Sequence, residues 1–231
     1  MKAAIFDVDR TIVDGMSGYF FYLIAKPHIP FARRLKTTLE LLEYRFGFTD
    51  EKRIVEIGAL IYAGLGVDLL KKIGEKCFEE MIKGRVFVEA LGRIKEHKDA
   101  GQKIFLASGS NEFVIAPIAR FVDADGFFAT GAKIENGAST KKLRFPLCFE
   151  DGKLELIAAK FSELNIDWKD CWFYSDNRSD ILIFEKCGHP IVVNPRDELE
   201  KMARERQWRV ELWRTLSDSS LSATGSHFPV R

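Results

Sequence analysis

The stretch that decides the fold is A-A-I-F-D-V-D-R-T-I-V, residues 3–13. Its first half is short, apolar and without helical period, which predicts a buried strand over residues 3–8. Asp7 and Asp9 stand where this strand should end. In parallel α/β sheets, ligands bind beyond the carboxyl ends of the strands. The acid pair is therefore a candidate functional site.

Polar residues follow two further strand-like runs in the same way. The run K-I-F-L-A-S ends at Ser108 and is followed by Gly109, and the run C-W-F-Y-S is followed by Asp176 and Asp180. Lys153 opens a helical stretch between these two runs. Each residue alone is weak evidence, because most acids, serines and lysines are solvated surface groups. Their order and their common place near strand ends are much more specific.

The remaining pattern defines a fold class. From residue 86 onward, strand-like runs alternate with helical ones, which predicts an α/β fold with a parallel sheet and helices on both faces. Residues 15–85 carry helical patterns instead, so we expect them to form an inserted helical cap domain. The core domain then consists of residues 1–14 and 86–214. Residues 215–231 are polar and unpatterned, and they are expected to be a disordered tail.

The composition limits the classes of partner. The chain has 231 residues, enough for one domain or one domain with a large insertion, and its formal net charge is +1. That balance gives no general attraction to nucleic acid or to an anionic membrane. The N-terminal residues include acids where a signal peptide needs an apolar stretch, and the longest apolar run near the front is too short to span a bilayer. We expect a cytoplasmic protein.

The cysteines argue against a zinc site. They are far apart, they form no C-x-x-C pair, and no histidines stand at ligand spacing. Scattered cysteines in a cytoplasmic protein are expected to be reduced and mostly buried thiols. The four are Cys77, Cys148, Cys171 and Cys187.

The acids at the strand ends would together suit phosphoryl chemistry. Asp7 and Asp176 could share a hard divalent cation, and Mg²⁺ prefers carboxylate and water oxygens. The cation would attract a phosphate and reduce the repulsion between the acids. Alternation along an extended chain puts Asp7 and Asp9 on the same side. One carboxylate could then attack phosphorus while its neighbour protonates the leaving oxygen.

Other groups would bind the phosphate itself. The hydroxyl of Ser108 and the N–H of Gly109 can donate hydrogen bonds to phosphate oxygens. Lys153 adds a positive charge against the nucleophile and the phosphate. The expected partner is therefore a small phosphorylated substrate, and the expected cofactor is Mg²⁺.

The four motifs D-V-D-R-T-I-V, L-A-S-G-S, D-G-K and Y-S-D-N-R-S-D resemble those of the haloacid dehalogenase superfamily of phosphohydrolases. The resemblance covers about residues 3–212. The helical insertion between the first two motifs is similar to the cap of the phosphoserine-phosphatase-like branch, subfamily IB. The resemblance implies a Rossmann-like core, a C1-type helical cap and a phosphatase that acts through an aspartyl-phosphate intermediate.

The resemblance also implies a role for the motif residues. Asp7 would be the nucleophile and Asp9 the general acid and base. Mg²⁺ would be held by the Asp7 carboxylate, the backbone carbonyl of Asp9 and Asp176. Lys153 and Ser108 would bind the transferred phosphoryl group.

Two more residues would support this arrangement. Asp180 would hold Lys153 or a metal-bound water, and Thr11 would brace the first loop. One position departs from the family pattern, because Arg10 stands where Gly or Ser is frequent. The branch tolerates variation there, so we expect catalysis to be intact.

Two departures from the phosphoserine phosphatases concern the substrate. Those enzymes carry a Glu nine residues after the nucleophile for the substrate ammonium, where this chain has Met16. They also carry an Arg for the substrate carboxylate shortly before a Gly-Leu pair, whereas Gly64 and Leu65 follow G-A-L-I-Y-A. A zwitterionic substrate would leave its charges unpaired. The sequence therefore predicts a less zwitterionic phosphomonoester.

The expected cap is rich in aromatic residues. Some should form the cap's own small core, and those directly after the first motif, Tyr19 and Phe20 with Met16, should face the substrate. The basic segment 26–36 is expected to be solvated, so membrane contact is disfavoured. The whole set is Met16, Tyr19, Phe20, Phe21, Tyr22, Phe31, Tyr44, Phe46 and Phe48.

Three alternatives stay open on the sequence alone. A phosphotransferase would form the same intermediate and pass the phosphoryl group to an alcohol. A phosphoserine phosphatase would have to bind the amino-acid charges with other residues. A non-catalytic binding module is disfavoured, because all four motifs keep functional residue types. The sequence does not determine the oligomeric state.

Overall fold

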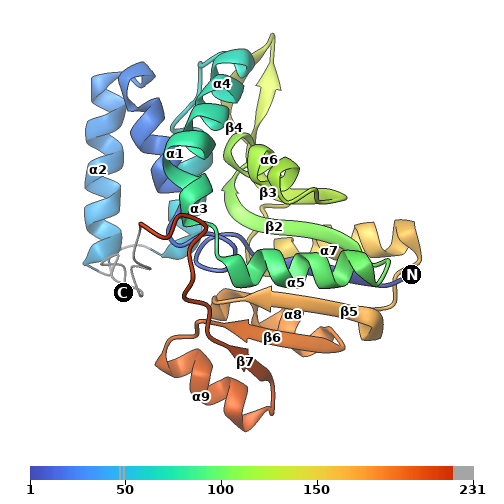
Figure 1. Ribbon diagram of the computed structural model, residues 1–231. Helices are drawn as coiled ribbons and strands as arrows, with labels where there is room; N and C mark the ends of the chain where they lie inside the picture. Colours follow the sequence, from blue (N-terminus) through green and yellow to red (C-terminus); the bar gives the residue numbers. More distant parts are fainter. Residues whose placement is uncertain (47, 49, 221–231) are drawn as a thin grey trace.

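Strand β1 (Ala3–Phe6) lies in the middle of the sheet, directly before the acid pair. It pairs in parallel with β2 (Lys103–Asn111) on one side and with β5 (Cys171–Ser175) on the other. All four residues of β1 are fully buried, as expected for a central strand that is covered on both faces. The computed structural model describes residues 1–46, 48 and 50–220 (Figure 1).

The sheet has seven strands in the described chain, in the order β4-β3-β2-β1-β5-β6-β7. Its strands are parallel except for β4, which a tight turn at Asn136 and Gly137 joins to β3 as an antiparallel hairpin. The structure confirms the predicted parallel sheet, whereas β7 was not predicted. The remaining strands are β3 (Gly126–Glu135), β4 (Ala138–Arg144), β6 (His189–Val193) and β7 (Arg209–Glu211).

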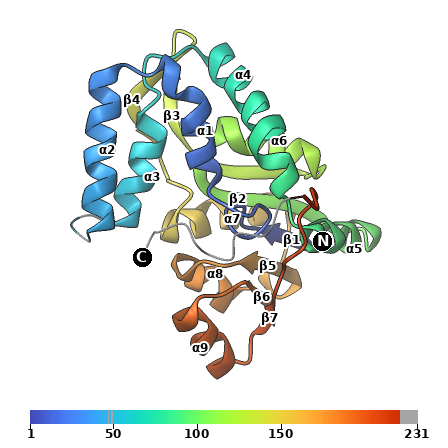
Figure 2. The ribbon, with the colours of Figure 1, turned by 60° about the vertical axis from the view of Figure 1, so that its left-hand side comes forward.

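Helices cover both faces of the sheet, as the α/β prediction requires (Figures 1 and 2). Ala4 and Phe6 belong to one hydrophobic cluster with α5 and α6, and Ala3 and Ile5 belong to a second with α7, α8 and α9. This alternation follows from the period of two along a strand. The helices are α5 (Val88–Asp99), α6 (Glu112–Phe121), α7 (Glu150–Leu164), α8 (Ile181–Lys186) and α9 (Asp197–Glu205).

The segment between β1 and α5 folds into helices and turns, as expected for the insertion. Its helices α1 and α4 pack on α6, and Phe21 and Leu70 lie in the same hydrophobic cluster as Phe6 of the sheet. Gly74 of α4 lies so close to α6 that a side chain there would collide with the carbonyl oxygen of Phe113. Helices α2 and α3 form the outer part (Figure 2). The helices are α1 (Ser17–Ala25), α2 (Phe31–Arg45), α3 (Glu51–Leu60) and α4 (Val67–Cys77).

Aromatic residues on and after α2 lie on the surface, which corrects the expectation that they help to build a core for the cap. Phe31 is 71% exposed, Phe46 69% and Phe48 82%. On the opposite side of α2, Thr37 is buried. An amphipathic pattern predicts a helix but does not tell which side faces inward. The side chain of Tyr44 lies outside the described part of the chain.

The segment after β7 packs against the core, which corrects the predicted start of the tail. Residues 215–218 form a strap, here called the C-terminal strap, across the start of α5. Within it Leu216 is buried, and the N–H of Ser217 donates to the carbonyl of Val86 at 2.8 Å. Residues 221–231 of the predicted tail lie outside the described residues.

All four cysteines are buried and free, as the sequence predicted. Their pKa values are raised by burial, to about 12 for Cys148, so these thiols stay protonated and inert at neutral pH. Across the part of the chain that the structure describes, no helix combines the length and the apolar character needed to cross a bilayer.

Candidate active site

The sheet brings the predicted motif residues to one edge. Asp7 follows β1, Ser108 lies near the end of β2, and Asp176 follows β5. These three strands are direct neighbours, so their carboxyl ends lie side by side. Lys153 reaches the same edge from the first turn of α7.

A buried ion-pair bridge organises the centre of this site. The Nζ of Lys153 lies 2.9 Å from Oδ1 of Asp7 and 2.8 Å from the carboxylate of Asp180. The Lys153 side chain is only 5% exposed. The hydroxyl of Ser175 donates to Asp180 at 2.6 Å. Because each buried charge has a partner at hydrogen-bonding distance, the bridge holds the Asp7 carboxylate in one orientation.

The negative charges of this cluster outnumber the nearby ammonium group. Burial raises the pKa of Asp7 well above its ordinary value, Lys153 opposes this rise, and the neighbouring acids add to it. Burial also raises the pKa of Asp176 to about 7, although Arg10 opposes the shift. For Lys153, burial alone would lower the pKa, but Asp180 and Asp7 outweigh it and raise the pKa. A further positive charge beside them would favour the ionised forms of Asp7 and Asp176.

Asp9 is held differently from Asp7. Its Oδ1 accepts a hydrogen bond from the N–H of Ser17 at 2.6 Å, and its Oδ2 accepts one from the hydroxyl of Ser110 at 2.8 Å. The hydroxyl of Ser17 in turn donates to the hydroxyl of Ser110 at 3.0 Å. Asp9 is therefore oriented jointly by the first turn of α1 and by the end of β2. Both oxygens of this half-buried carboxylate therefore accept hydrogen bonds from neutral donors.

The loop after β1 is held by a side-chain contact to a neighbouring loop and by hydrogen bonds within its own backbone. The buried hydroxyl of Thr11 accepts from the N–H of Asp176 at 3.1 Å, so it ties this loop to the loop after β5. Arg10 has a φ of 61°, in the left-handed region that favours glycine. Its N–H donates to the carbonyls of Val13 at 2.8 Å and Gly15 at 3.1 Å. These bonds offset the steric cost of a left-handed backbone conformation at a residue with a side chain, which is about 1–2 kcal/mol.

Ser108 and Gly109 lie beneath the inserted helices. Ser108 is buried, and its hydroxyl accepts from the N–H of Ser110 at 3.1 Å. A side chain at Gly109 would come within 3.2 Å of Val55 on α3 and 3.7 Å of the carbonyl of Cys148. Helix α3 therefore covers the second motif closely.

Three residues of this site were missed by the sequence analysis. Ser17 and Ser110 hold Asp9, and Val55 covers the glycine of the second motif. Ser110 stands inside the quoted motif L-A-S-G-S, so its position was a usable signal. Nothing in the sequence marks Ser17 or Val55, because their contacts depend on how the insertion packs.

The predicted substrate-facing residues of the insertion lie in different surroundings. Met16 is half-buried directly before α1, and Tyr19 is 43% exposed. The ring of Phe20 is only 4% exposed, lies against Gly15 and is covered by the guanidinium of Arg85 at 5.5 Å. Phe20 thus packs beneath the first loop, and substrate contact by Met16, Tyr19 and Phe20 stays a prediction.

The acid cluster fits a hard cation of the Mg²⁺ type. Neither a hydrogen bond nor an ion pair reaches the Asp176 carboxylate from any residue that the structure describes. Among the described residues, no three or more His, Cys, Asp or Glu side chains are placed so that they alone could hold a metal ion. A cation would then rest on Asp7, Asp176, a backbone carbonyl and water. Mg²⁺ is often bound in this way, through one or two carboxylates together with waters and substrate phosphate.

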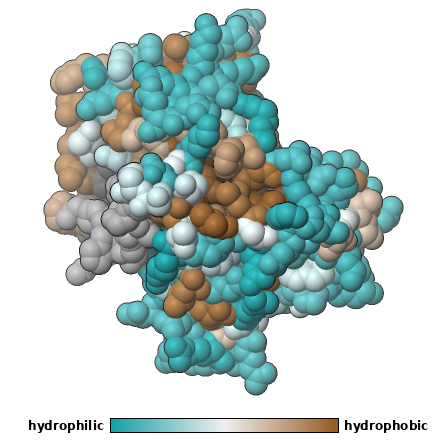
Figure 3. Space-filling model, viewed as in Figure 1, coloured by the Kyte–Doolittle hydropathy of each residue, from teal (hydrophilic) through white to brown (hydrophobic). Residues whose placement is uncertain are grey.

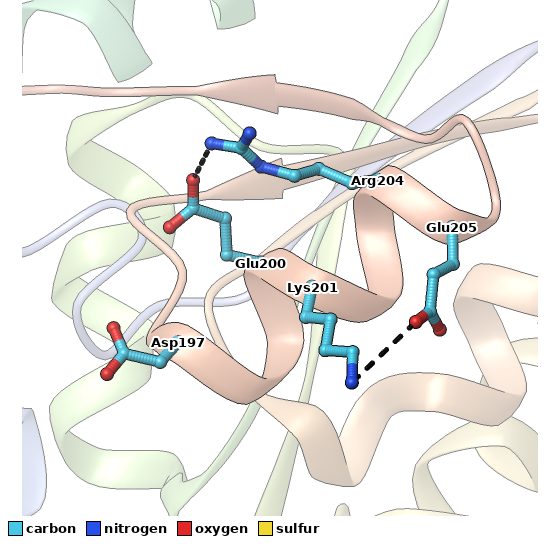
Figure 4. Close-up of a pocket in the computed structure, with 5 residues that line it drawn as sticks. All are labelled: Asp197, Glu200, Lys201, Arg204 and Glu205. Atoms are coloured by element: carbon cyan, nitrogen blue, oxygen red, sulfur yellow. Dashed lines mark hydrogen bonds and ion pairs between the residues drawn. The ribbon is translucent and has the colours of Figure 1, made fainter.

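A surface depression on α9 is not a candidate site. Its lining consists of charged side chains, and Glu200 pairs with Arg204 at 2.5 Å and Lys201 with Glu205 at 4.0 Å (Figure 4). These are exposed pairs along one helix, which stabilise a helix slightly and leave little charge for a ligand.

Known proteins resemble this chain over most of its length. The profile of the haloacid dehalogenase-like hydrolases matches residues 4–185. The probable phosphatase Rv3661 of Mycobacterium tuberculosis is 30% identical, over 90% of this chain and 74% of its own length. The phosphoserine phosphatase SerB1 of the same species is 27% identical, over 92% and 71%. A solved structure from Bordetella pertussis, a protein of unknown function, is 26% identical with a TM-score of 0.81, over 90% and 96%.

Proposed function

The chain belongs to the haloacid dehalogenase-like hydrolases and is a phosphatase of that family. We propose that it hydrolyses a small phosphomonoester, that the reaction passes through an aspartyl phosphate on Asp7, and that Mg²⁺ is the cofactor. The observation that carries this proposal is the buried bridge from Lys153 to Asp7 and Asp180. It holds one carboxylate, largely stripped of water, at the edge of the sheet where a ligand binds. Covalent catalysis needs such an oriented nucleophile.

The reaction then has two displacements. The carboxylate of Asp7 attacks phosphorus, the bond to the leaving oxygen breaks, and Asp9 gives that oxygen a proton. Asp9 next takes a proton from water, whose oxygen attacks phosphorus and releases Asp7 and phosphate. Ser108 and the N–H of Gly109 donate to the phosphoryl oxygens. Mg²⁺, when held by Asp7 and Asp176, supplies the charge that offsets the negative phosphoryl oxygens.

The substrate class follows from the charges that the insertion offers. Met16 carries no charge for a substrate ammonium. Arg33 lies beside the segment before Gly64, but its Nη1 donates to the carbonyls of Ile61, at 3.0 Å, and Ala63. Its guanidinium is therefore engaged by backbone. These features support a phosphomonoester without a zwitterionic head group.

A substrate panel tests this proposal. With Mg²⁺ present, we expect kcat/KM for phenyl phosphate or glycerol phosphate to exceed that for phosphoserine by about tenfold or more, because unpaired buried charges cost about 1–3 kcal/mol. Phosphate release is measured for each compound, with and without an added alcohol acceptor. A preference for phosphoserine would contradict the substrate class alone. Failure to hydrolyse any phosphomonoester would contradict the reaction.

Metal binding is expected to depend steeply on pH. The pKa of Asp176 is raised to about 7, so without metal the folded state holds a proton that the unfolded state loses near its ordinary value of 3.8. Stability without metal should therefore fall as the pH rises from about 4 to about 7. Mg²⁺ competes with this proton, so its affinity should rise about tenfold per pH unit below pH 7 and level off above it.

Calorimetric titration of Mg²⁺ at about pH 5, pH 6.5 and pH 8 measures this dependence. The matched control is Asp176→Asn, which should bind Mg²⁺ weakly at every pH. The stability of this variant without metal should also vary less with pH. Equal affinity of the wild type at the lowest and highest pH would contradict the prediction.

Other expectations from the sequence stay predictions. They are a cytoplasmic location and the absence of nucleic-acid partners, and they rest on composition and charge. The division into a core domain and a cap domain is also retained as a proposal. This division needs a qualification, because α1 and α4 share a hydrophobic cluster with the sheet and α3 contacts β2, β3 and β4. Helix α2 is then the outer element of the insertion.

A further inference from the structure

The outer side of α2 carries a long apolar surface. Its exposed side chains begin at Phe31 and recur at spacings of four, four and three residues, and two more exposed apolar residues, Phe46 and Phe48, follow the helix. Apolar atoms run along the left-hand edge of the molecule, where α2 lies (Figures 1 and 3). The α2 stripe consists of Phe31 (71% exposed), Leu35 (51%), Leu39 (53%), Leu42 (45%), Phe46 (69%) and Phe48 (82%).

The α2 stripe points away from the side on which α2 packs. Thr37 is buried, and Glu40 forms an ion pair with Arg53 of α3 at 2.8 Å. At 100° per residue, Thr37 and Glu40 lie roughly half a turn from the middle of the stripe. A surface helix of a globular protein normally turns its apolar side inward. Among the side chains of α2 that the structure describes, Thr37 and Glu40 lie on the packed side, whereas Leu35, Leu39 and Leu42 are exposed.

The spacing of these residues is that of a coiled-coil seam. Ala32, Leu35, Leu39, Leu42 and Phe46 alternate at three and four residues, which places them at the a and d positions of two heptads. Ala32 is exposed as well. A seam of this kind is buried when a second helix lies alongside it, so the shape favours a helix as the occupant.

The charges beside the seam suit a second copy of the same helix. Lys36 and Glu43 both occupy e positions, one heptad apart, and both are exposed. When two copies of α2 lie antiparallel about a twofold axis, their e positions face each other. Lys36 of each copy then lies near Glu43 of the other, and opposite charges meet twice.

We propose that the α2 stripe is the contact surface of a homodimer in which the two α2 helices pack antiparallel. The exposed area of the six side chains is on the order of 700 Å² per copy, close to the ~800 Å² that each partner gives to a standard stable interface. This inference does not depend on the proposed reaction. Helix α3 contacts both α2 and the sheet, so the α2 stripe does not face the motif residues directly (Figure 2).

The first test is the mass of the full-length protein in solution, measured by sedimentation over a wide concentration range. We expect a dimer with a micromolar Kd for the wild type. Leu39→Glu should weaken dimerisation about 100-fold, since it places two like charges near the axis of an apolar seam. Its circular dichroism and phosphatase activity should match the wild type, because Leu39 is exposed and far from the motifs. A monomeric wild type overturns the proposal.

The second test exchanges the flanking charges. Lys36→Glu and Glu43→Lys each turn two attractive pairs into repulsive ones, and each should raise the Kd about tenfold. The double variant restores opposite charges, so its Kd should return to within about threefold of the wild type. A double variant as weak as either single one overturns the antiparallel pairing.

A lipid surface would give a different pattern. Monomers that co-sediment with phosphatidylserine vesicles, more weakly after Lys36→Glu and more strongly after Glu43→Lys, would overturn the proposal, since a membrane responds to net charge. Wild-type dimers that do not co-sediment support it.

Discussion

Asp7→Asn is expected to lower kcat for phosphate release by about 10⁴-fold or more, because an amide cannot attack phosphorus. The fold should persist. The amide has nearly the shape of the carboxylate, and the variant removes a charge whose burial already raises the pKa of Asp7. The midpoint of urea unfolding should therefore be close to that of the wild type.

The measurement is single-turnover phosphate release, together with trapping of phosphorylated protein by acid quench. The wild type should carry an acid-quenched phosphoryl group that hydroxylamine removes, as expected for an acyl phosphate, and Asp7→Asn should carry none. Asp151→Asn is a matched control, because Asp151 is exposed on α7, and its activity should stay within about twofold. Substantial activity in Asp7→Asn would refute the covalent mechanism.

Lys153→Met is expected to lower the free energy of unfolding by about 3–5 kcal/mol, because it leaves two buried carboxylates without their shared ammonium. Methionine keeps most of the volume of the side chain, so loss of charge dominates over loss of packing. The loss should be larger at pH 8 than at pH 5, since burial raises the pKa of Asp7 and this carboxylate can take up a proton at the lower pH. Activity should fall as well, since in the proposed reaction Lys153 orients the attacking carboxylate of Asp7.

Urea unfolding at both pH values measures this effect. Lys160→Met is the matched control on the same helix, where an exposed pair with Glu163 at 2.7 Å should be worth less than about 1 kcal/mol. A loss in Lys153→Met no greater than in Lys160→Met would show that the buried bridge does not stabilise the fold. Adding Asp180→Asn to Lys153→Met should recover part of the loss, because one unpaired charge is removed.

The strands were predictable where an apolar run ends at polar residues. The run at 171–175 was predicted from such a pattern, and β5 spans Cys171–Ser175. By contrast, β7 has only three residues, Arg209–Glu211, and none of them is fully buried. So short and polar a run carries no strand signal, and its pairing with β6 is decided by tertiary structure.

The site was predictable to the extent that its residues stand in local motifs. Asp7, Lys153 and Asp180 meet because parallel strands end at one edge, which the order of elements already implies. The hydrogen bond from Ser17 to Asp9 was not predictable, because it depends on where α1 begins relative to the sheet. The exposure of the apolar side of α2 was not predicted for the same kind of reason. The periodic pattern shows which residues share one side of the helix, but not whether that side faces the core or the solvent.

The C-terminal strap has a consequence for the order of events during synthesis. The carbonyl of Val86, where the chain enters α5, accepts its hydrogen bond from Ser217, which is translated much later. Until residues 216 and 217 have left the ribosome, the entry to α5 lacks this contact and the burial of Leu216. A nascent chain that stops short of the strap should therefore remain open to proteases at this junction.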